Sequence, residues 1–241
     1  MVSVLKIGGS VLTGAQGYRR AAALIAKRLC ELAGERVLAV VSAEFGATDA
    51  LLAAARDIVT EPDATTLDLL WSTGEVRSAA LLALHLHTLG VNAVALNVHQ
   101  AGLVEPDDAS CAGHAEVRTL GLRAALAAHD AVIVPGFLAR GAGDRIVSLG
   151  RGGSDLTAVL LAAGLRARCC ELVKDVPGYF SCDPNVHPDA HPLPTLDFTR
   201  ALAMADEGCE LVQRQALEAA AYHHLPLVVR SIDRDGATVI S

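Results

Sequence analysis

The sequence predicts an α/β fold in which helices pack on a buried, parallel sheet. Hydrophobic residues make up 52% of the 241 residues, and aromatic residues only 3%. A chain rich in Ala, Leu and Val is typical of helices that cover a buried sheet. Apolar runs that predict buried strands also alternate with segments of helical spacing, which is the order of elements in a parallel α/β protein.

The elements follow from this alternation, with glycine and polar turns between them. In chain order, the predicted strands are 2–7, 36–41, 91–98, 131–134, 145–149, 169–173, 225–230 and 237–240. The predicted helices are 18–33, 50–59, 65–89, 115–128, 156–165, 196–206 and 209–223, and 100–113 is predicted to be an irregular loop. No linker, repeat or low-complexity segment divides the chain, so one domain with two lobes about a cleft is predicted.

Composition excludes several classes of function. The net charge is −7 at pH 7 and no basic stripe occurs, which argues against nucleic acid as a partner. No apolar run has the length and lack of charge of a membrane span, and the N-terminus lacks a signal-peptide pattern. We therefore expect a cytoplasmic protein.

The six cysteines show no C-x-x-C spacing. Free thiols in a reducing compartment are therefore expected, rather than disulfides or a zinc site. No metal ligand is predicted.

The segment 148–155, Ser-Leu-Gly-Arg-Gly-Gly-Ser-Asp, joins a predicted strand to a predicted helix. A strand, a glycine turn and a helix N-terminus together direct backbone N–H groups at an anion. Arg151 adds a planar fork that suits a carboxylate or a phosphate. The alternative is a tight turn capped by Ser154 or Asp155. That alternative does not explain three glycines in four positions, so a ligand site is favoured.

A second glycine turn, Gly8-Gly9-Ser10, follows the first predicted strand, with Lys6 near its end. It is either an anion nest beside an ammonium group or an ordinary turn with a solvated lysine. The lysines of the chain are Lys6, Lys27 and Lys174, so lysine is rare. Ligands of open α/β sheets bind outside the carboxyl ends of the strands, where this turn and those at Ser42, Gly136 and Gly150 are expected to converge.

Seven segments taken together resemble the catalytic domain of aspartokinases, within the amino-acid kinase superfamily. They are KIGGS at 6–10, SAEFGATD at 42–49, GE at 74–75, PGF at 135–137, SLGRGGSD at 148–155, DVPGYFSCDP at 175–184 and the tail 225–241. They occur in family order and cover essentially the whole chain. No GxxxxGK[ST] occurs, so the glycine turns are not a Walker P-loop.

The resemblance implies a three-layer αβα sandwich with a mainly parallel central sheet of about eight strands. It implies a single domain over 1–241, with a substrate lobe at about 1–165 and a nucleotide lobe at about 166–241, and a homodimer. The implied reaction, with ATP and Mg²⁺, transfers the γ-phosphoryl group to the side-chain carboxylate of L-aspartate without a covalent enzyme intermediate. Charge neutralisation and positioning would supply the catalysis.

The resemblance also implies roles for individual residues. Lys6 would contact the transferred phosphoryl group and Asp155 would hold Lys6, while Arg151 would bind a substrate carboxylate. Glu75 would accept a hydrogen bond from the substrate ammonium, although helix periodicity alone favours a solvated position for it. The remaining amino-acid pocket would consist of Ser42, Thr48, Phe137, Gly153 and Ser154. The nucleotide side would consist of Gly8, Gly9, Ser10, Lys174, Asp175, Gly178, Phe180 and Pro184.

The chain departs from the family pattern at four positions, all on the nucleotide side. They are Lys174 for Ser or Thr, Phe180 for a hydroxylated aromatic residue, Asn185 for Arg and Glu210 for Lys. Lys174 is expected to compensate by reaching the β- and γ-phosphates. The C-terminal ACT domains typical of aspartokinases do not follow in this sequence, so feedback through such domains is not expected.

Two alternatives stay open from the sequence. The first keeps the fold and phosphorylates a different carboxylate acceptor. The second is a catalytically weakened subunit that binds a nucleotide or an anion, because Asn185 and Glu210 replace expected cations.

Overall fold

A central sheet with eight strands organises the protein in the computed structural model, which describes residues 1–32, 34–105, 116–150 and 152–241. Its strands are β1 (Val2–Ile7), β2 (Arg36–Val41), β3 (Ala93–Ala95), β6 (Ala131–Pro135), β9 (Cys170–Lys174), β10 (Thr195–Leu196), β11 (Leu227–Ser231) and β12 (Ala237–Ile240). Their order is β10-β12-β11-β9-β1-β2-β6-β3, and the pairs are parallel except β11 with β12.

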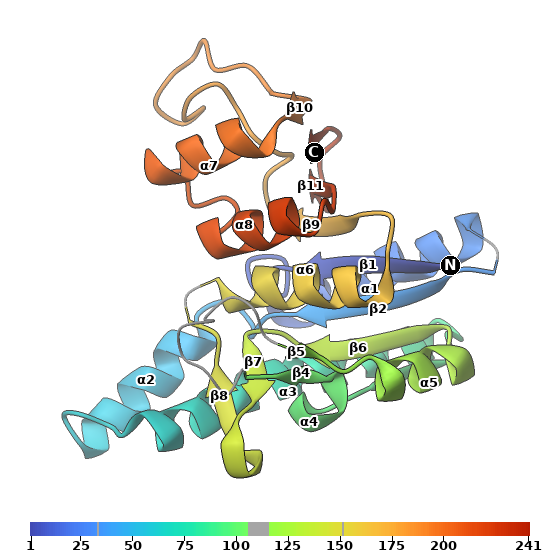
Figure 1. Ribbon diagram of the computed structural model, residues 1–241, viewed down its shortest axis with the longest axis vertical. Helices are drawn as coiled ribbons and strands as arrows, with labels where there is room; N and C mark the ends of the chain where they lie inside the picture. Colours follow the sequence, from blue (N-terminus) through green and yellow to red (C-terminus); the bar gives the residue numbers. More distant parts are fainter. Residues whose placement is uncertain (33, 106–115, 151) are drawn as a thin grey trace.

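Helices cover both faces of this sheet (Figure 1). They are α1 (Gly14–Glu31), α2 (Ala47–Ile58), α3 (Ala64–Thr88), α4 (Val98–Ala101), α5 (Leu120–Ala128), α6 (Gly153–Leu165), α7 (Phe198–Asp206) and α8 (Arg214–Tyr222). Helices α1 and α3 pack on one face, and α5, α6 and α8 pack on the other. The predicted αβα sandwich with a mainly parallel, about eight-stranded sheet is therefore confirmed.

The strands supply two cores at once, because alternate side chains point to opposite faces of a sheet. In β2, Val37, Ala39 and Val41 join the core beneath α1 and α3, whereas Leu38 and Val40 join the core beneath α5 and α6. Burial on both faces explains why 36–41 is a continuous apolar run rather than an alternating one.

A smaller sheet lies beside the carboxyl end of β6 (Figure 1). It consists of β5 (Glu116–Val117), β4 (Leu103–Val104), β7 (Leu138–Arg140) and β8 (Ile146–Ser148), in that order. The predicted strand at 145–149 is therefore real, but it pairs antiparallel with β7 and is not part of the central sheet. Part of the predicted loop 100–113, with Cys111, lies outside the described residues.

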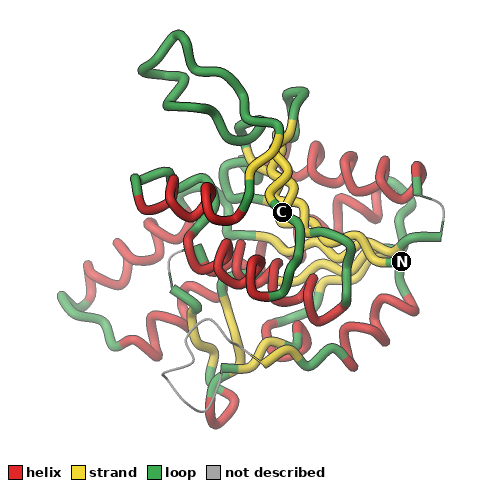
Figure 2. Tube along the Cα trace, turned by 45° about the horizontal axis from the view of Figure 1, so that its top comes forward, coloured by secondary structure: helices red, strands yellow, loops and turns green. Residues whose placement is uncertain are grey.

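Two helix starts differ from the predicted ones, and both differences matter for the site. Helix α6 begins at Gly153 rather than residue 156, so Ser154 and Asp155 lie in its first turn. Helix α8 begins at Arg214 rather than residue 209, so the residues before it form an irregular segment. A long loop between β9 and β10 projects away from the sheet at the top of Figure 2.

Within the described ranges, no helix combines the length and the apolar character needed to cross a bilayer.

The two-sided core gives a direct stability prediction. Ile133 in β6 is fully buried, so Ile133→Ala is expected to lower the free energy of unfolding by about 2–5 kcal/mol. Ile58 at the end of α2 is 87% exposed, and the same truncation there is expected to change it by less than about 0.5 kcal/mol. Urea unfolding of both variants checks this; equal losses would contradict the assignment of the core.

Candidate active site

A cavity of about 360 Å³ opens at the carboxyl ends of the central strands. Its described lining residues are Lys6, Ser42, Ala43, Thr48, Glu75, Phe137, Gly152, Gly153, Ser154, Asp155, Lys174, Glu210 and Gln213. The turns that follow β1, β2 and β6 and the turn before α6 therefore converge, as the sequence predicted. Arg151, the predicted carboxylate clamp, lies outside the described residues.

A cluster of three charged side chains lies against this cavity. The Nζ atom of Lys6 is 2.9 Å from one carboxylate oxygen of Asp155, and the Nζ atom of Lys174 is 2.8 Å from the other. Lys6 lies near the end of β1, Lys174 at the end of the neighbouring strand β9, and Asp155 in the first turn of α6. Two ammonium groups on one carboxylate leave a net positive charge, which suits an anion.

The cluster is almost completely buried, which determines its ionisation. Burial by itself raises the pKa of Asp155, but the charges of Lys6 and Lys174 outweigh it and lower that pKa to about 2. Burial and the neighbouring ammonium of Lys6 lower the pKa of Lys174. Asp155 is therefore a carboxylate at neutral pH, and it fixes both ammonium groups in place.

Glu75 reaches the same cavity from the middle of α3 and is 4% exposed. Its Oε1 atom accepts a hydrogen bond from the Ala43 N–H at 3.3 Å, and Oε2 has no hydrogen-bond partner within the described structure. Burial raises its pKa to about 7. Gly74 permits this approach, because a Cβ atom there would lie 3.1 Å from the Ala43 Cβ atom. Glu75 therefore lies at the cavity and not at the solvated position that helix periodicity favours.

Close backbone packing accounts for the first glycine turn. A Cβ atom on Gly9 would lie 2.6 Å from the Ala43 carbonyl oxygen, and one on Gly8 would lie 3.3 Å from the Val173 carbonyl oxygen. Ser10 donates a hydrogen bond to Asp175 Oδ1 at 3.0 Å, which joins this turn to the end of β9. The turn thus lies between two neighbouring strand ends, beside Lys6.

The second glycine turn also has a packing explanation. Gly150 and Gly152 both have φ of 77°, and a Cβ atom on Gly152 would lie 1.9 Å from Gln213 Cγ. A Cβ atom on Gly153 would lie 3.1 Å from Phe137 Cα. Close contacts thus require Gly152 and Gly153, and a positive φ favours glycine at position 150, so the three glycines are not by themselves evidence of a ligand.

Phe137 and Ser154 form one wall of the cavity. Phe137 has a positive φ of 70°, and its N–H donates to Thr157 Oγ1 at 3.1 Å. Its ring meets the Trp71 ring edge-on, with centroids 5.9 Å apart. Gly136 permits close packing here, because a Cβ atom on it would lie 2.8 Å from Ser154 Cβ.

Three of the other predicted nucleotide residues line a second cavity, of about 540 Å³. Gly178, Phe180, Pro184 and Asn185 line it, as does Arg200 from α7. Cys209 and Leu211 line the second cavity while Glu210 between them lines the first, so one irregular segment forms a wall of both. Asp175 lines neither cavity within the described residues and instead bonds to Ser10.

The lining residues that the sequence does not predict include Gln213, Arg200 and Ala43. Gln213 falls within the predicted helix 209–223, a position that gives no signal of a site. Arg200 lies on an amphipathic helix, where a guanidinium is usually a solvated surface group. Ala43 contributes its backbone N–H, a group that every non-proline residue has, and so gives no signal in a sequence.

The fold and this cavity define the chain as an α/β protein with a buried Lys–Asp–Lys cluster in a cavity at the carboxyl ends of its strands. Residues 1–231 match the model of the Amino acid kinase family, and the chain belongs to that family.

Individual relatives agree with this assignment. The chain is 37% identical over 241 residues to an aspartokinase of Mycolicibacterium smegmatis, covering 98% of this chain and 56% of that protein. It is 35% identical over 239 residues to an aspartokinase of Pseudomonas aeruginosa, covering 99% and 58%. The chain thus spans little more than half the length of these relatives.

Solved structures are similar over the whole chain. An aspartate kinase from Synechocystis superposes with a TM-score of 0.87 at 31% identity, covering 100% of this chain and 40% of that one. Aspartokinase III of E. coli, in complex with aspartate and ADP, superposes with a TM-score of 0.81 at 25% identity, covering 100% and 64%. A uridylate kinase from Archaeoglobus fulgidus, at 18% identity and a TM-score of 0.70, shows the same fold.

The glycine turn before α6 gives a matched pair of variants. Gly150→Ala places a side chain at positive φ in open space and is expected to cost about 1–2 kcal/mol of unfolding free energy. Gly152→Ala has the same φ but also collides with Gln213, which is expected to add about 1–3 kcal/mol. Chemical denaturation measures both. Equal costs would contradict the packing of this turn against Gln213.

Proposed function

We propose that this chain transfers the γ-phosphoryl group of ATP to the side-chain carboxylate of L-aspartate, giving aspartyl phosphate and ADP. The cluster of Lys6, Asp155 and Lys174 is the observation that carries this proposal, because it fixes two cations where an amino-acid pocket meets a nucleotide side. The similarity to aspartokinases over nearly the whole chain supports the choice of acceptor.

In the proposed reaction, a carboxylate oxygen of aspartate forms a bond to the γ-phosphorus of ATP. The bond from that phosphorus to the oxygen shared with the β-phosphate breaks, and its electron pair leaves on ADP. An ionised acceptor has no proton to lose, so no general base is needed. Lys6 and Lys174 neutralise charge on the phosphoryl oxygens, and Asp155 holds both ammonium groups so that they need not reorganise.

Glu75 is the proposed partner of the substrate ammonium, because its Oε2 atom is buried, has no described hydrogen-bond partner and borders the cavity. Ser42, Thr48, Phe137, Gly153 and Ser154 would surround the rest of the amino acid. From the sequence resemblance, Arg151 would bind the substrate's α-carboxylate as a bidentate fork.

The second cavity is the proposed nucleotide pocket, with Gly178, Phe180 and Pro184 in its wall. Gly8, Gly9 and Ser10 would lie along the phosphates, and Arg200 offers a guanidinium where Asn185 replaces the family's arginine. Magnesium would accompany the phosphates and neutralise part of their charge. Glu210, and Asp175 beside Ser10, would offer carboxylate oxygens of the kind that this ion prefers.

A second candidate function is a subunit that binds a nucleotide or an anion without turnover. Glu210 favours it, since this carboxylate replaces a family lysine and lines the same cavity as Lys6. Lys174 argues for catalysis, because its ammonium group lies 2.8 Å from Asp155. It thereby supplies, from the end of β9, a cation in place of the family lysine that Glu210 replaces.

The wider organisation also belongs to this proposal. The substrate lobe would span about 1–165 and the nucleotide lobe about 166–241 of a single domain, with the central sheet continuous through both. A homodimer and a cytoplasmic location stay predictions from the sequence.

The reaction can be tested with purified protein, ATP, Mg²⁺ and L-aspartate, with hydroxylamine to trap the acyl phosphate as a hydroxamate. Lys6→Met and Lys174→Met are each expected to lower kcat by about 10²–10³-fold, because each removes a cation that faces developing charge. Lys27→Met, at an exposed site on α1, is the matched control and should retain full activity.

The outcomes separate the two candidates. Nucleotide binding without hydroxamate from any amino acid would support the non-catalytic subunit. Full activity in Lys174→Met would contradict the role given to that residue.

Glu75 predicts a pH dependence of amino-acid binding. Its pKa is raised from 4.5 to about 7 in the free protein, so below pH 7 a proton must leave before the carboxylate pairs with an ammonium. Affinity for L-aspartate is therefore expected to rise by up to about tenfold per pH unit below 7 and to level off above it. Calorimetric titration measures this. Glu75→Gln should bind more weakly, without that slope; an unchanged slope would rule out Glu75 as its source.

A further inference from the structure

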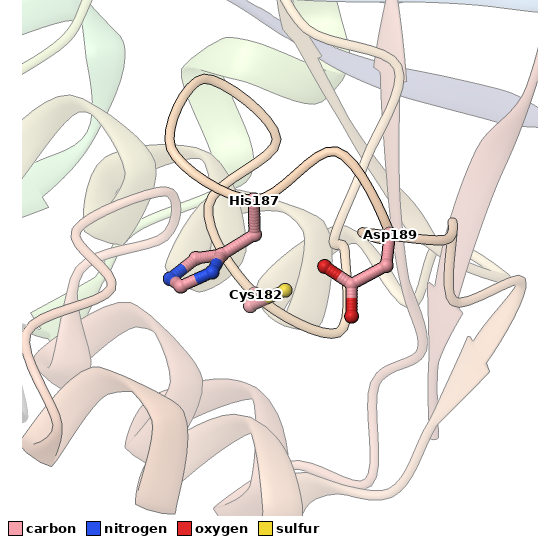
Figure 3. Close-up of side chains that lie close together, drawn as sticks. All are labelled: Cys182, His187 and Asp189. Atoms are coloured by element: carbon pink, nitrogen blue, oxygen red, sulfur yellow. The ribbon is translucent and has the colours of Figure 1, made fainter.

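The loop between β9 and β10 contains a group of side chains that the proposed reaction does not use. Cys182, His187 and Asp189 each present one ligand atom, and these atoms all lie within 4.8 Å of one another (Figure 3). Their order in the chain is C-x4-H-x-D, a short spacing within one loop. The close-up shows Cys182 between the other two residues, with the Asp189 carboxylate directed toward it from one side and the His187 ring on the other.

Backbone hydrogen bonds determine the shape of this loop. Phe180 and Pro192 form an antiparallel bridge, and Ser181 N–H donates to the His191 carbonyl oxygen at 2.9 Å, so the two ends of the loop are held together. Inside it, the N–H groups of Val186 and His187 both donate to the Asp183 carbonyl oxygen. Cys182, His187 and Asp189 therefore lie close together because of backbone structure.

Neighbouring polar groups make few contacts with these three side chains: the Cys182 thiol lies 3.8 Å from Ser181 Oγ, a weak hydrogen bond that metal binding would replace. The Asp183 carboxylate accepts hydrogen bonds from the Asn185 backbone N–H at 2.9 Å and from its side-chain amide at 3.0 Å. His191 Nδ1 lies 3.2 Å from Ser181 Oγ.

The chemistry of the three donors selects a class of metal. A thiolate and an imidazole are soft or borderline ligands that favour zinc over magnesium or calcium, and a carboxylate is a common third ligand. Tetrahedral coordination places ligand atoms about 3.5 Å apart, so the three ligand atoms must move about 1 Å closer to one another to bind one ion. His187 and Asp189 are exposed and can close that gap by rotation toward the half-buried Cys182, with water as the fourth ligand.

We propose that Cys182, His187 and Asp189 form a binding site for one zinc-class transition-metal ion. The bound ion would connect both halves of the loop across its open middle. Because Phe180, Cys182, Pro184 and Asn185 also line the second cavity, the ion would stiffen one wall of that cavity. Metal binding itself does not depend on the proposed kinase activity.

The test uses the full chain after treatment with a chelator, titrated with Co²⁺ as a spectroscopic probe and with Zn²⁺ in a calorimeter. One metal ion per chain is expected, with a thiolate-to-cobalt charge-transfer band. Cys182→Ser should abolish the band, and His187→Ala and Asp189→Asn should each weaken Zn²⁺ binding by more than about tenfold. Cys30→Ser removes an exposed thiol on α1 and is the matched control that should leave the band unchanged.

Two further measurements separate a lost site from a lost fold. Urea unfolding in chelator should be the same for wild type and the loop variants. Limited proteolysis within 180–192 should be slowed by Zn²⁺ in wild type and not in Cys182→Ser. A band that survives in Cys182→Ser, or equal Zn²⁺ affinity in wild type and all three loop variants, would overturn the proposal, as would no binding at all.

Discussion

The charge balance around Asp155 is the constraint on which the site depends. One buried carboxylate is the ion-pair partner of two largely buried ammonium groups, and removing it would leave both without that partner beside the cavity. The same carboxylate lies in the first turn of α6, where the positive end of the helix dipole favours a negative charge. A single side chain thus fixes the positions of a strand, its neighbour and a helix.

The central sheet delivers these groups to one place. Lys6 and Lys174 come from β1 and β9, which pair in parallel, so backbone hydrogen bonds determine their relative position. The loop after β2 supplies the Ala43 N–H that fixes one oxygen of Glu75, while the other oxygen stays without a described partner. Strand pairing therefore determines the relative position of the two lysines, and helix α3 with the loop after β2 determines that of Glu75.

The sequence predicted what depends on local pattern and motif. Continuous apolar runs identified the buried strands, and the glycine turns identified which strand ends converge. It did not predict the small sheet, because β4 and β5 are two residues each and have no periodicity to detect. It placed Gln213 in a helix because the spacing of 209–223 is helical, whereas α8 begins at Arg214 and Gln213 packs against Gly152. The position of Arg200 at the second cavity depends on distances between elements, and the cluster at Cys182 depends on distances across a loop. No rule of sequence spacing gives either.

The irregular segment at 207–213 borders both cavities, and this has a thermodynamic consequence. A ligand that orders this segment on binding to one cavity bears the loss of its conformational entropy. A ligand of the other cavity then binds to an ordered segment without that loss. Each ligand would thereby strengthen the binding of the other, by the same factor whichever arrives first. Cooperativity between the two ligands would then arise within one chain, from a single shared stretch of backbone.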